Sequence, residues 1–439
     1  MITSLLRTAQ SWRATRRREP FATEAANPDN RKSSMPPPRQ DRSCVIIVEN
    51  LPVPFDRRVW QEAQALSRAG WTVSVICPAN PDFPKRFEVI DDIAIYRHPL
   101  PPEGRGALAY FREYSAAVFH QMRLLIKVHR ERGFSIIQAC NPPDLIFLPV
   151  IPFKLMGKRF IFDQHDVSPE LFVVKFGNKG LLYRSLLFFE RLSYAMADHV
   201  ITANATFKDI AVSRGGKAPS LVEVVYGVPD RKRLHRVEPE PGLHGGRKFV
   251  IGYLGIINEQ DGVEHLVRAV DHLVKVRKFR DFRAVVVGSG PALELVRALA
   301  RSLELDDFLS FPGYLSGKAL LAYISAFDIG VIPDPLNEAN DLMSMNKVFE
   351  YCALGIPTAC YPLKETKRLL GDAGVYAASP DPAGLADACL SLMQNECLRT
   401  RCATAATKLA AENFLWEHEA RKYVATYERV LEGAPSRRG

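Results

Sequence analysis

The stretch NDLMSMNKVFEYCALGIP, residues 340–357, joins a polar loop to a short apolar helix and decides the fold of this chain. It lies between DIGVIPD, residues 328–334, and PTACYPL, residues 357–363, which are short apolar runs typical of buried strands. A strand, a helix and a second strand in this order form the crossover unit of a parallel sheet. We therefore predict an α/β fold here, with Ser344 as the N-cap of the helix and its backbone N–H groups facing outward.

The same alternation of strands and helices extends from this stretch in both directions. Upstream, FVIGYLG (249–255) and RAVVVGSG (283–290) flank the helical pattern of residues 262–277. Near the start, CVIIVEN (44–50) is followed by a helical pattern that ends at Gly70. Further strands are predicted at WTVSVICP (71–78), FSIIQAC (134–140), RFIFDQHD (159–166), DHVITAN (198–204), FLSFPGY (308–314) and GVYAAS (374–379).

Residues 229–248 interrupt the alternation, because they are rich in proline, glycine and charge and have no apolar period. We predict two doubly wound, Rossmann-like α/β domains that face a cleft at the carboxyl ends of their strands. The predicted organisation is a disordered basic segment (1–43), a first domain (44–228), a linker (229–248), a second domain (249–413), a C-terminal helix that packs back towards the first domain (414–433) and a tail (434–439).

Composition limits the class of protein. Hydrophobic residues make up 47% of the chain and charged residues 24%, which is typical of globular domains, and no apolar run is long enough to span a bilayer. The eight cysteines form no C-x-x-C pair and lie mostly in apolar runs, which indicates reduced core residues. With no secretory signal pattern at the N-terminus, we expect a cytoplasmic protein, soluble or peripheral on the inner face of the plasma membrane.

The net charge of +9 is concentrated in the first half of the chain, and the second half is slightly acidic. A basic face favours an anionic neighbour such as a membrane surface, although a solvated charge excess without a partner is the alternative. Two segments of the first half could serve such a surface, residues 107–132 and residues 181–198, because both are apolar and the first also carries basic residues. Packing in the core is the alternative for both.

Two stretches of the second half are suited to a phosphorylated ligand. Gly288 and Gly290 end a strand and open a helix, where a backbone can approach an anion, although a plain tight turn explains them equally well. In residues 340–357, Lys347 would add charge to the helix N-terminus, and Glu350 could accept hydrogen bonds from a ribose diol. The alternative is an ordinary Lys and Glu pair on a solvated helix face.

In the first half, Asp163, His165 and Asp166 follow a strand end, so their side chains should point towards the ligand side of the sheet. A structural histidine is the alternative. Arg57 and Arg58 begin the first helix and could bind phosphate, or form a surface salt bridge with a neighbouring acid.

Taken together, these motifs resemble a family. VENLPVPFDRRVWQEAQALSRAGWTVSVICP, FDQHDVSPELF, GYLGIINEQDGVEHLVRAV, VVVGSGP and the block from Asn340 to Ala377 are similar to bacterial glycosyltransferases of family 4, in the branch that builds surface polysaccharides. The resemblance covers about residues 44–433. It implies the GT-B fold and transfer of a sugar with retention, from a nucleotide-sugar donor to a glycan or lipid-linked acceptor, with no metal and no other cofactor. The chain lacks a D-x-D triplet, which agrees with the absence of a metal.

The resemblance also assigns roles to residues. Glu350 resembles the glutamate that holds the donor ribose, and His165 the residue that contacts the transferred sugar, with Asp163 and Asp166 beside it. Arg57, Arg58 and Asn141 are expected at the phosphate and acceptor side. The expected donor-binding residues are Glu350, Lys347, Asn346, Ser344, Gly288, Gly290, Gly255 and Asp341.

Three positions depart from the pattern of the family. Leu342 stands where the first glutamate of the E-x7-E motif is usual, and Ile256 and Asp261 replace the usual arginine and lysine. Positive charge must then come from Lys347, Arg57 or Arg58. These departures leave room for a catalytically degenerate scaffold, and a nucleotide-sugar epimerase with the same two-domain fold is a further alternative. No nucleic-acid-binding signature is present in the sequence.

Overall fold

The computed structural model describes residues 42–99 and 107–433, and the side chains of residues 107–114 are outside the description. The predicted basic segment therefore lies outside the described residues, apart from Arg42 and Ser43, and so does the predicted tail. The chain forms two compact units. The first consists of residues 1–165, 188–201 and 423–439, and the second of residues 166–187 and 202–422.

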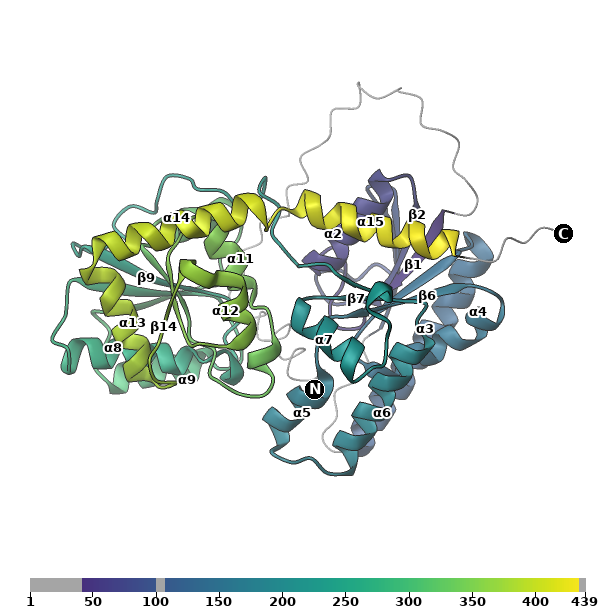
Figure 1. Cartoon of the computed structure of the whole chain (residues 1–439), viewed down its shortest axis with the longest axis horizontal. Helices are drawn as coiled ribbons and strands as arrows, with labels where there is room; N and C mark the ends of the chain where they lie inside the picture. Colours follow the sequence, from purple (N-terminus) through teal and green to yellow (C-terminus); the bar gives the residue numbers. More distant parts are fainter. Residues whose placement is uncertain (1–41, 100–106, 434–439) are drawn as a thin grey trace, which may run out of the picture. The chain divides into compact units, whose positions relative to one another are not determined.

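The first sheet has the strand order β3-β4-β2-β1-β5-β6-β7-β8 (Figure 1). Parallel pairing joins β2, β1, β5 and β6, as predicted from the strand and helix alternation, and β4, which was not predicted, also pairs with β2 in parallel. Strands β1 and β5 are completely buried, which explains why their sequences are continuous apolar runs. The strands are β1 (Ser43–Ile47), β2 (Thr72–Pro78), β3 (Phe87–Ile90), β4 (Ile93–His98), β5 (Ile136–Cys140), β6 (Arg159–Gln164), β7 (His199–Thr202) and β8 (Val222–Val224).

The antiparallel pair β3–β4 is an exception to the predicted parallel arrangement. Asp91 and Asp92 form the two-residue connection, and both have positive φ angles, 50° and 64°. Two consecutive left-handed residues are what a tight hairpin turn requires, and aspartate tolerates this conformation better than most residues. The hairpin adds one antiparallel strand, β3, at the edge of a sheet whose other described strand pairs are parallel.

Helix α2 (Arg57–Arg68) shows how the local sequence sets an element. The side chain of Asp56 accepts a hydrogen bond from the backbone N–H of Val59 and caps the helix, and Val59, Ala63 and Leu66 form its buried stripe. The other helices that precede the predicted linker are α3 (Ala107–Glu131), α4 (Ile151–Leu155), α5 (Ser168–Phe176), α6 (Leu181–Met196) and α7 (Ala205–Ser213), and α15 (Trp416–Glu432) is the last helix of the described residues.

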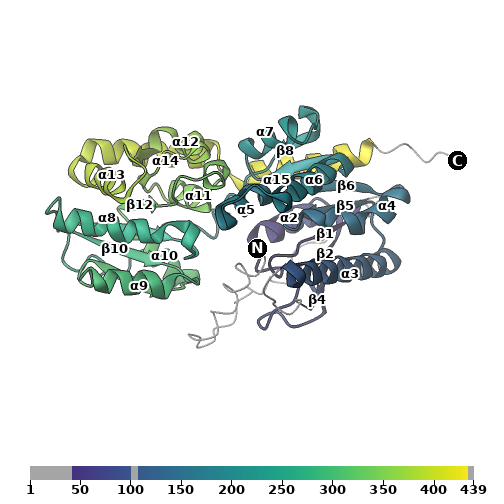
Figure 2. The same cartoon turned by 90° about the horizontal axis from the view of Figure 1, so that it is seen from below.

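The second sheet has the order β11-β10-β9-β12-β13-β14, and all of its printed pairs are parallel. Helix α8 packs against α9 and α13, and α11 packs against α12 and α14 (Figure 2). The strands are β9 (Phe249–Leu254), β10 (Phe282–Val287), β11 (Leu309–Gly313), β12 (Ile329–Ile332), β13 (Thr358–Cys360) and β14 (Gly374–Tyr376). The helices are α8 (Val263–Lys275), α9 (Leu293–Ser302), α10 (Gly317–Ser325), α11 (Asn346–Ala353), α12 (Lys364–Leu370), α13 (Pro382–Gln394) and α14 (Glu396–Glu412).

The start of α11 corrects one prediction. The helix begins at Asn346, its N-cap position is Met345, and no side chain caps it, so Ser344 is not the N-cap. The backbone at Met345 is extended, which places Ser344 in the preceding loop. The first N–H groups of α11 therefore have no side-chain cap from their own N-cap residue.

The cysteines agree with the prediction of reduced core residues. All eight are free thiols in the structure; seven are buried and Cys397 is exposed. Within the described residues, no helix is both long and apolar enough to cross a membrane.

Candidate functional site

The N-terminus of α11 brings a buried cation to the carboxyl ends of β9 and β12. Lys347 is only 7% exposed, and its ammonium group lies 3.3 Å from the carboxylate of Asp334, directly after β12. The same Nζ lies 5.0 Å from the ring centroid of Tyr253 in β9. Lys347 thus does not form the solvated helix pair with Glu350 that was the alternative prediction. Its ammonium group faces the strand ends, where parallel α/β sheets bind their ligands.

Two carboxylates share this ammonium group. Burial would lower the pKa of Lys347, but Asp334 and Asp261 outweigh that effect and raise it. Burial raises the pKa of Asp334 to about 6 although Lys347 opposes the change, and burial also raises the pKa of Asp261. Asp261 additionally forms a reciprocal capping box with Asn258. No local pattern indicated that Asp334 would contact Lys347, because the two residues lie on different elements.

Gly288 and Gly290 are required by the packing of two strand-end loops. A Cβ added at Gly288 would lie 1.8 Å from the carbonyl oxygen of Gly255, and one at Gly290 would lie 2.3 Å from the carbonyl oxygen of Ile257. The loops are also joined by a hydrogen bond from the Ile257 N–H to the Ser289 carbonyl (3.1 Å). These glycines therefore allow close approach of backbone to backbone, within the loops that would carry a ligand.

The other predicted donor-side residues of the second unit have separate positions. Asp341 accepts a hydrogen bond from the backbone N–H of Lys364 (2.7 Å), so it caps the first turn of α12. Asn346 is exposed at the start of α11, Ser344 is half-buried in the preceding loop, and Glu350 is half-buried one turn into the helix. The structure thus brings Lys347 and Gly255 together, because a Cβ added at Gly255 would lie 3.6 Å from Nζ of Lys347. Asp341, in contrast, binds the backbone of α12.

In the first unit, His165, Asp163 and Arg58 form one buried network. Nε2 of His165 lies 2.9 Å from Oδ2 of Asp163 and 3.1 Å from Nε of Arg58. Arg58 also donates from Nη2 to Oδ1 of Asp163 (3.2 Å) and pairs with Glu62 (3.0 Å). Arg58 is therefore committed to buried carboxylates, and the prediction that it supplies charge for a phosphate is not supported by its contacts.

Charge interactions decide the protonation states of this network. Burial would raise the pKa of Asp163, but His165 and Arg58 lower it to about 2. Burial, followed by the charge of Asp163, raises the pKa of Glu62 to about 8, so Glu62 is mainly protonated at neutral pH. Burial would lower the pKa of His165, but the charge of Asp163 and its hydrogen bond raise it. Asp163 is thus the ionised member that holds the imidazole ring.

The network continues to the C-terminal helix through Gln138 of β5. Gln138 donates from Nε2 to Asp163 (2.8 Å) and to Glu62 (3.0 Å). Its Oε1 accepts hydrogen bonds from the hydroxyls of Tyr423 and Tyr427 on α15, both at 2.6 Å. The sequence analysis missed Gln138, whose only local signal is a polar residue within an otherwise apolar strand. It offered Glu62 only as one of the acids that could form a salt bridge with the arginines at the start of α2, and the structure shows this pair for Arg58.

Three further residues were predicted for the sugar, phosphate and acceptor side of the site: Asn141, Arg57 and Asp166. Asn141 is buried, and its Oδ1 accepts a hydrogen bond from the backbone N–H of His165 (2.7 Å) while its Nδ2 donates to Asp144 (2.8 Å). It therefore braces the backbone that carries His165. Arg57 is exposed at the first turn of α2, and Asp166 is half-buried directly after His165.

Potential ligand atoms of Cys140, Asp163 and His165 lie within 4.8 Å of one another, which raises the question of a metal ion. The surroundings do not suit one, because the guanidinium of Arg58 contacts both Asp163 and His165. Burial and nearby carboxylates also raise the pKa of the Cys140 thiol, whereas a metal ligand must be a thiolate. The cluster is better described as a charge network than as a metal centre.

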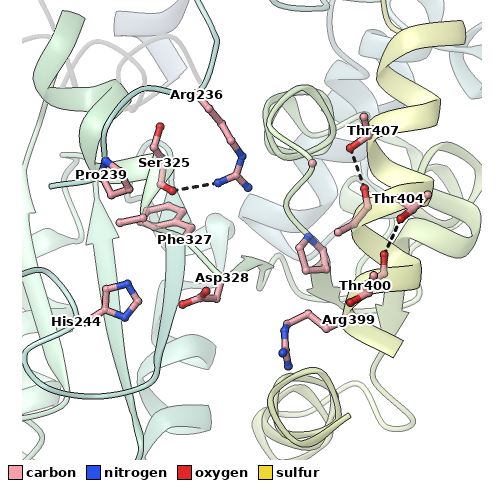
Figure 3. A pocket seen from close by; sticks show the side chains of 14 residues that line it. Arg236, Pro239, His244, Ser325, Phe327, Asp328, Arg399, Thr400, Thr404 and Thr407 are labelled. Atoms are coloured by element: carbon pink, nitrogen blue, oxygen red, sulfur yellow. Dashed lines mark hydrogen bonds between the residues drawn. The ribbon is translucent and has the colours of Figure 1, made fainter. Parts of the chain in front are cut away.

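A pocket of about 500 Å³ lies elsewhere in the second unit, at the amino ends of β12 and β13. Figure 3 shows Asp328 and Phe327 between Arg236 and Arg399, with Thr400, Thr404 and Thr407 on one helix. Arg236 donates to the carbonyls of Ser325 (3.1 Å) and Leu354 (2.7 Å). These bonds hold the segment predicted as a linker against the second sheet, at the edge opposite to Lys347.

The two units, each a parallel α/β sheet with helices on both sides, define the GT-B class of glycosyltransferase folds. Sucrose-phosphate synthase from Thermosynechococcus elongatus matches with a TM-score of 0.72 at 15% identity, over 89% of this chain and 100% of that chain. HepE from Anabaena, in complex with UDP and glucose, matches with a TM-score of 0.67 at 15% identity, over 88% and 100%. A UDP-N-acetylglucosamine 2-epimerase from Listeria monocytogenes, described as putative, matches with a TM-score of 0.60 at 14% identity, over 90% and 98%.

Sequence comparison identifies the family. Residues 56–227 match the glycosyl transferase 4-like domain, and residues 248–395 match the glycosyl transferases group 1 domain. The chain belongs to this group 1, glycosyltransferase 4-like family, whose members use nucleotide-sugar donors. The predicted family is thus confirmed, and its polysaccharide branch stays a prediction.

Two curated relatives differ in how much of the chain they match. The 2-deoxystreptamine glucosyltransferase of Streptomyces kanamyceticus is 26% identical over 55% of this chain and 63% of the relative. The match therefore spans less than two thirds of that relative. The phosphatidyl-myo-inositol mannosyltransferase of Mycobacterium leprae is 25% identical over 87% of this chain and 94% of its own length.

Proposed function

We propose that this chain transfers a sugar from a nucleotide-sugar donor, with retention and without a metal, to a glycan or lipid-linked acceptor in the synthesis of a bacterial surface polysaccharide. The observation that carries the proposal is the buried ammonium of Lys347, which the N-terminus of α11 holds beside Gly255 at the strand ends. A cation, a helix N-terminus and a tightly packed glycine loop together suit a diphosphate. HepE from Anabaena, which has a similar fold, was solved in complex with UDP and glucose, and this supports a nucleotide-sugar donor.

Each unit has a separate part in this proposal. In the second unit, Lys347 and the α11 N–H groups hold the diphosphate, and Glu350 accepts hydrogen bonds from the ribose. In the first unit, His165 contacts the transferred sugar, and Asp163 fixes its ring through Nε2. Within the described residues, Nδ1 of His165 has no hydrogen-bond partner, so it is available to a sugar hydroxyl. The departing diphosphate takes the proton of the acceptor hydroxyl, so no further base is needed.

A lipid-linked acceptor is part of the proposal because the M. leprae relative, which matches over nearly its whole length, is named for a phosphatidyl-inositol substrate. An anionic membrane surface is accordingly the proposed site of action, on the cytoplasmic side. The fold alone does not separate a transferase from an epimerase, since a structure described as an epimerase shares it. The two activities are distinguished by their reactions, because an epimerase converts a nucleotide sugar without any acceptor, whereas a transferase needs one.

The test is a thermal-shift panel of UDP, GDP, ADP and dTDP sugars on the purified chain. A ligand at 100 times its Kd stabilises the folded state by about 2.7 kcal/mol, which raises the midpoint by several degrees. We expect one nucleotide class to do so, and Glu350→Ala to abolish the shift. Glu264→Ala is the matched control, because Glu264 is an exposed acid on α8 that pairs only weakly with Arg268. No shift with any donor would instead favour the scaffold interpretation.

A further inference from the structure

Helices α5 and α6 follow each other along the chain and are joined by a short turn (Figure 1). Large apolar side chains in and beside this turn are exposed. Leu181 is 81% exposed, Leu182 is 62% exposed, Phe176 is 45% exposed and Val174 is 39% exposed. All four lie within a few residues of the turn, and we call them the hairpin patch. Two adjacent leucines at the first turn of a helix cost free energy in water, so their exposure calls for an apolar partner.

The burial of the described side chains differs between the two segments that the sequence left open. In α3, Ala117, Leu125 and Val128 are buried, whereas Phe119 is 65% exposed and Ile126 is 39% exposed, so one face of this helix packs in the core. In α6, the buried residues lie near the C-terminal end, at Glu190, Ser193 and Tyr194. The first turns of α6 do not reach the core, and core packing therefore does not explain the leucines of the hairpin patch.

The charges around the hairpin patch have one sign. Residues 171–189 contain three basic residues, Lys175, Lys179 and Arg184, and no acidic residue. All three basic side chains are exposed. Lys179 pairs with Glu338, but both side chains are about half exposed, so solvent weakens this ion pair. The hairpin patch thus combines exposed apolar side chains, which an apolar phase could bury, with long basic side chains whose charged ends can remain in water.

We propose that the hairpin patch docks the protein on an anionic bilayer, with Leu181, Leu182 and Phe176 entering the boundary between headgroups and acyl chains. The basic residues beside them would contact lipid phosphates. This inference deepens the proposed function, because a lipid-linked acceptor is reached only at such a surface. A second copy of this chain is a poorer occupant, since its own patch would place like charges opposite each other. A purely apolar partner would offer no counter-charge to the three basic residues, of which Lys179 has one from Glu338.

The experiment is sedimentation of the full-length protein with vesicles of phosphatidylethanolamine and phosphatidylglycerol, compared with pure phosphatidylcholine vesicles. No donor or acceptor is present, so the result is independent of transferase activity, and a failed donor shift would leave it unaffected. We expect the partition coefficient on anionic vesicles to fall by about tenfold in Leu181→Ser/Leu182→Ser. Lys175→Gln/Arg184→Gln should lower it by about tenfold or more on anionic vesicles only.

Leu295→Ser is the matched control, because Leu295 on α9 is 64% exposed but has no part in the hairpin patch. Its partition coefficient should equal that of the unmodified protein. Equal binding of the leucine double variant and the unmodified protein would overturn the inference, as would an equal loss in Leu295→Ser. A change of oligomeric state in the leucine variant, without a change in vesicle binding, would assign the patch to a second copy instead. Because these positions are exposed, the variants should fold, and an unchanged unfolding midpoint would verify this.

Discussion

Replacing Asp163 with asparagine tests whether a buried carboxylate organises the network around His165. Asp163 is completely buried and contacts Arg58, Gln138 and His165 at 3.2, 2.8 and 2.9 Å. Lowering a carboxyl pKa from 3.8 to about 2 corresponds to about 2–3 kcal/mol of stabilisation of the ionised form. The variant also leaves the buried guanidinium of Arg58 without its ionised partner, which typically costs about 3–5 kcal/mol. We therefore expect Asp163→Asn to lower the free energy of unfolding by about 3 kcal/mol at pH 7.

The pH dependence gives this prediction its sign. Because the folded-state pKa of Asp163 is depressed, its ionised form stabilises the folded state fully above about pH 4. This contribution to the free energy of unfolding is lost as the pH falls towards 2, and about half of it remains at pH 3. The difference in the free energy of unfolding between the variant and the unmodified protein should therefore become smaller as the pH falls over this range. Urea unfolding followed by tryptophan fluorescence is suitable, since Trp60 and Trp71 are buried in the same unit. A difference that does not change between pH 7 and pH 3 would refute the assignment of an ionised Asp163.

An exposed ion pair provides the control for this experiment. Arg277 binds Asp387 through two hydrogen bonds, at 2.7 and 2.5 Å, but both side chains are more than 40% exposed. Asp387→Asn should therefore lower the free energy of unfolding much less than Asp163→Asn does. If the exposed and buried variants lose equal stability, then burial does not strengthen the Asp163 network as argued here. A fall in the His165 pKa in Asp163→Asn, measured by NMR, would independently report the lost charge.

Further predictions concern both units. Gly288→Ala should lower stability by about 2–3 kcal/mol even without ligand, since its Cβ would meet the Gly255 carbonyl; an unchanged thermal midpoint would contradict this packing role. Donor affinity, measured by calorimetry, should rise as the pH falls from 7 to 5.5, because protonating Asp334 frees the charge of Lys347; Asp334→Asn should remove this dependence. His165→Ala should lower kcat at least tenfold with a smaller change in donor Kd, and full activity would exclude His165 from the reaction.

The sequence was sufficient for the elements that depend on local patterns. Strand β1 and helix α2 were predicted because one is a continuous apolar run and the other has apolar residues at helical spacing that end at Gly70. The hairpin β3–β4 was missed, although the two aspartates of its turn carried the signal. The placement of Ser344 as an N-cap was wrong by one residue, because side-chain capping competes with the geometry of the preceding loop.

The partners of the candidate site were not predictable, because they come from distant parts of the chain. Gln138 meets Tyr423 across a separation of 285 residues, and no local pattern links them. Arg58 was expected to bind phosphate because a guanidinium suits bidentate phosphate contacts, with a salt bridge to a neighbouring acid such as Glu62 as the alternative, and the fold places both Glu62 and the distant Asp163 beside it. A residue type indicates which chemistry is available to a side chain, whereas its partner decides which chemistry it performs.

The difference between Asp163 and Asp166 shows why this matters for the reaction. The sequence presents them as equivalent carboxylates on either side of a histidine. In the structure Asp163 lies on the buried side, where it holds Nε2 of His165, while Asn141 fixes the backbone of the same residue. The backbone and the ring of His165 are thereby each held by one of these residues, and Nδ1 is the ring nitrogen left for a substrate. A histidine held in this way can bind a sugar hydroxyl in one orientation, which favours a positioning role over free proton exchange. If that is correct, replacing Asp163 should lower turnover nearly as much as replacing His165, whereas replacing Asp166 should leave the orientation of the ring unchanged.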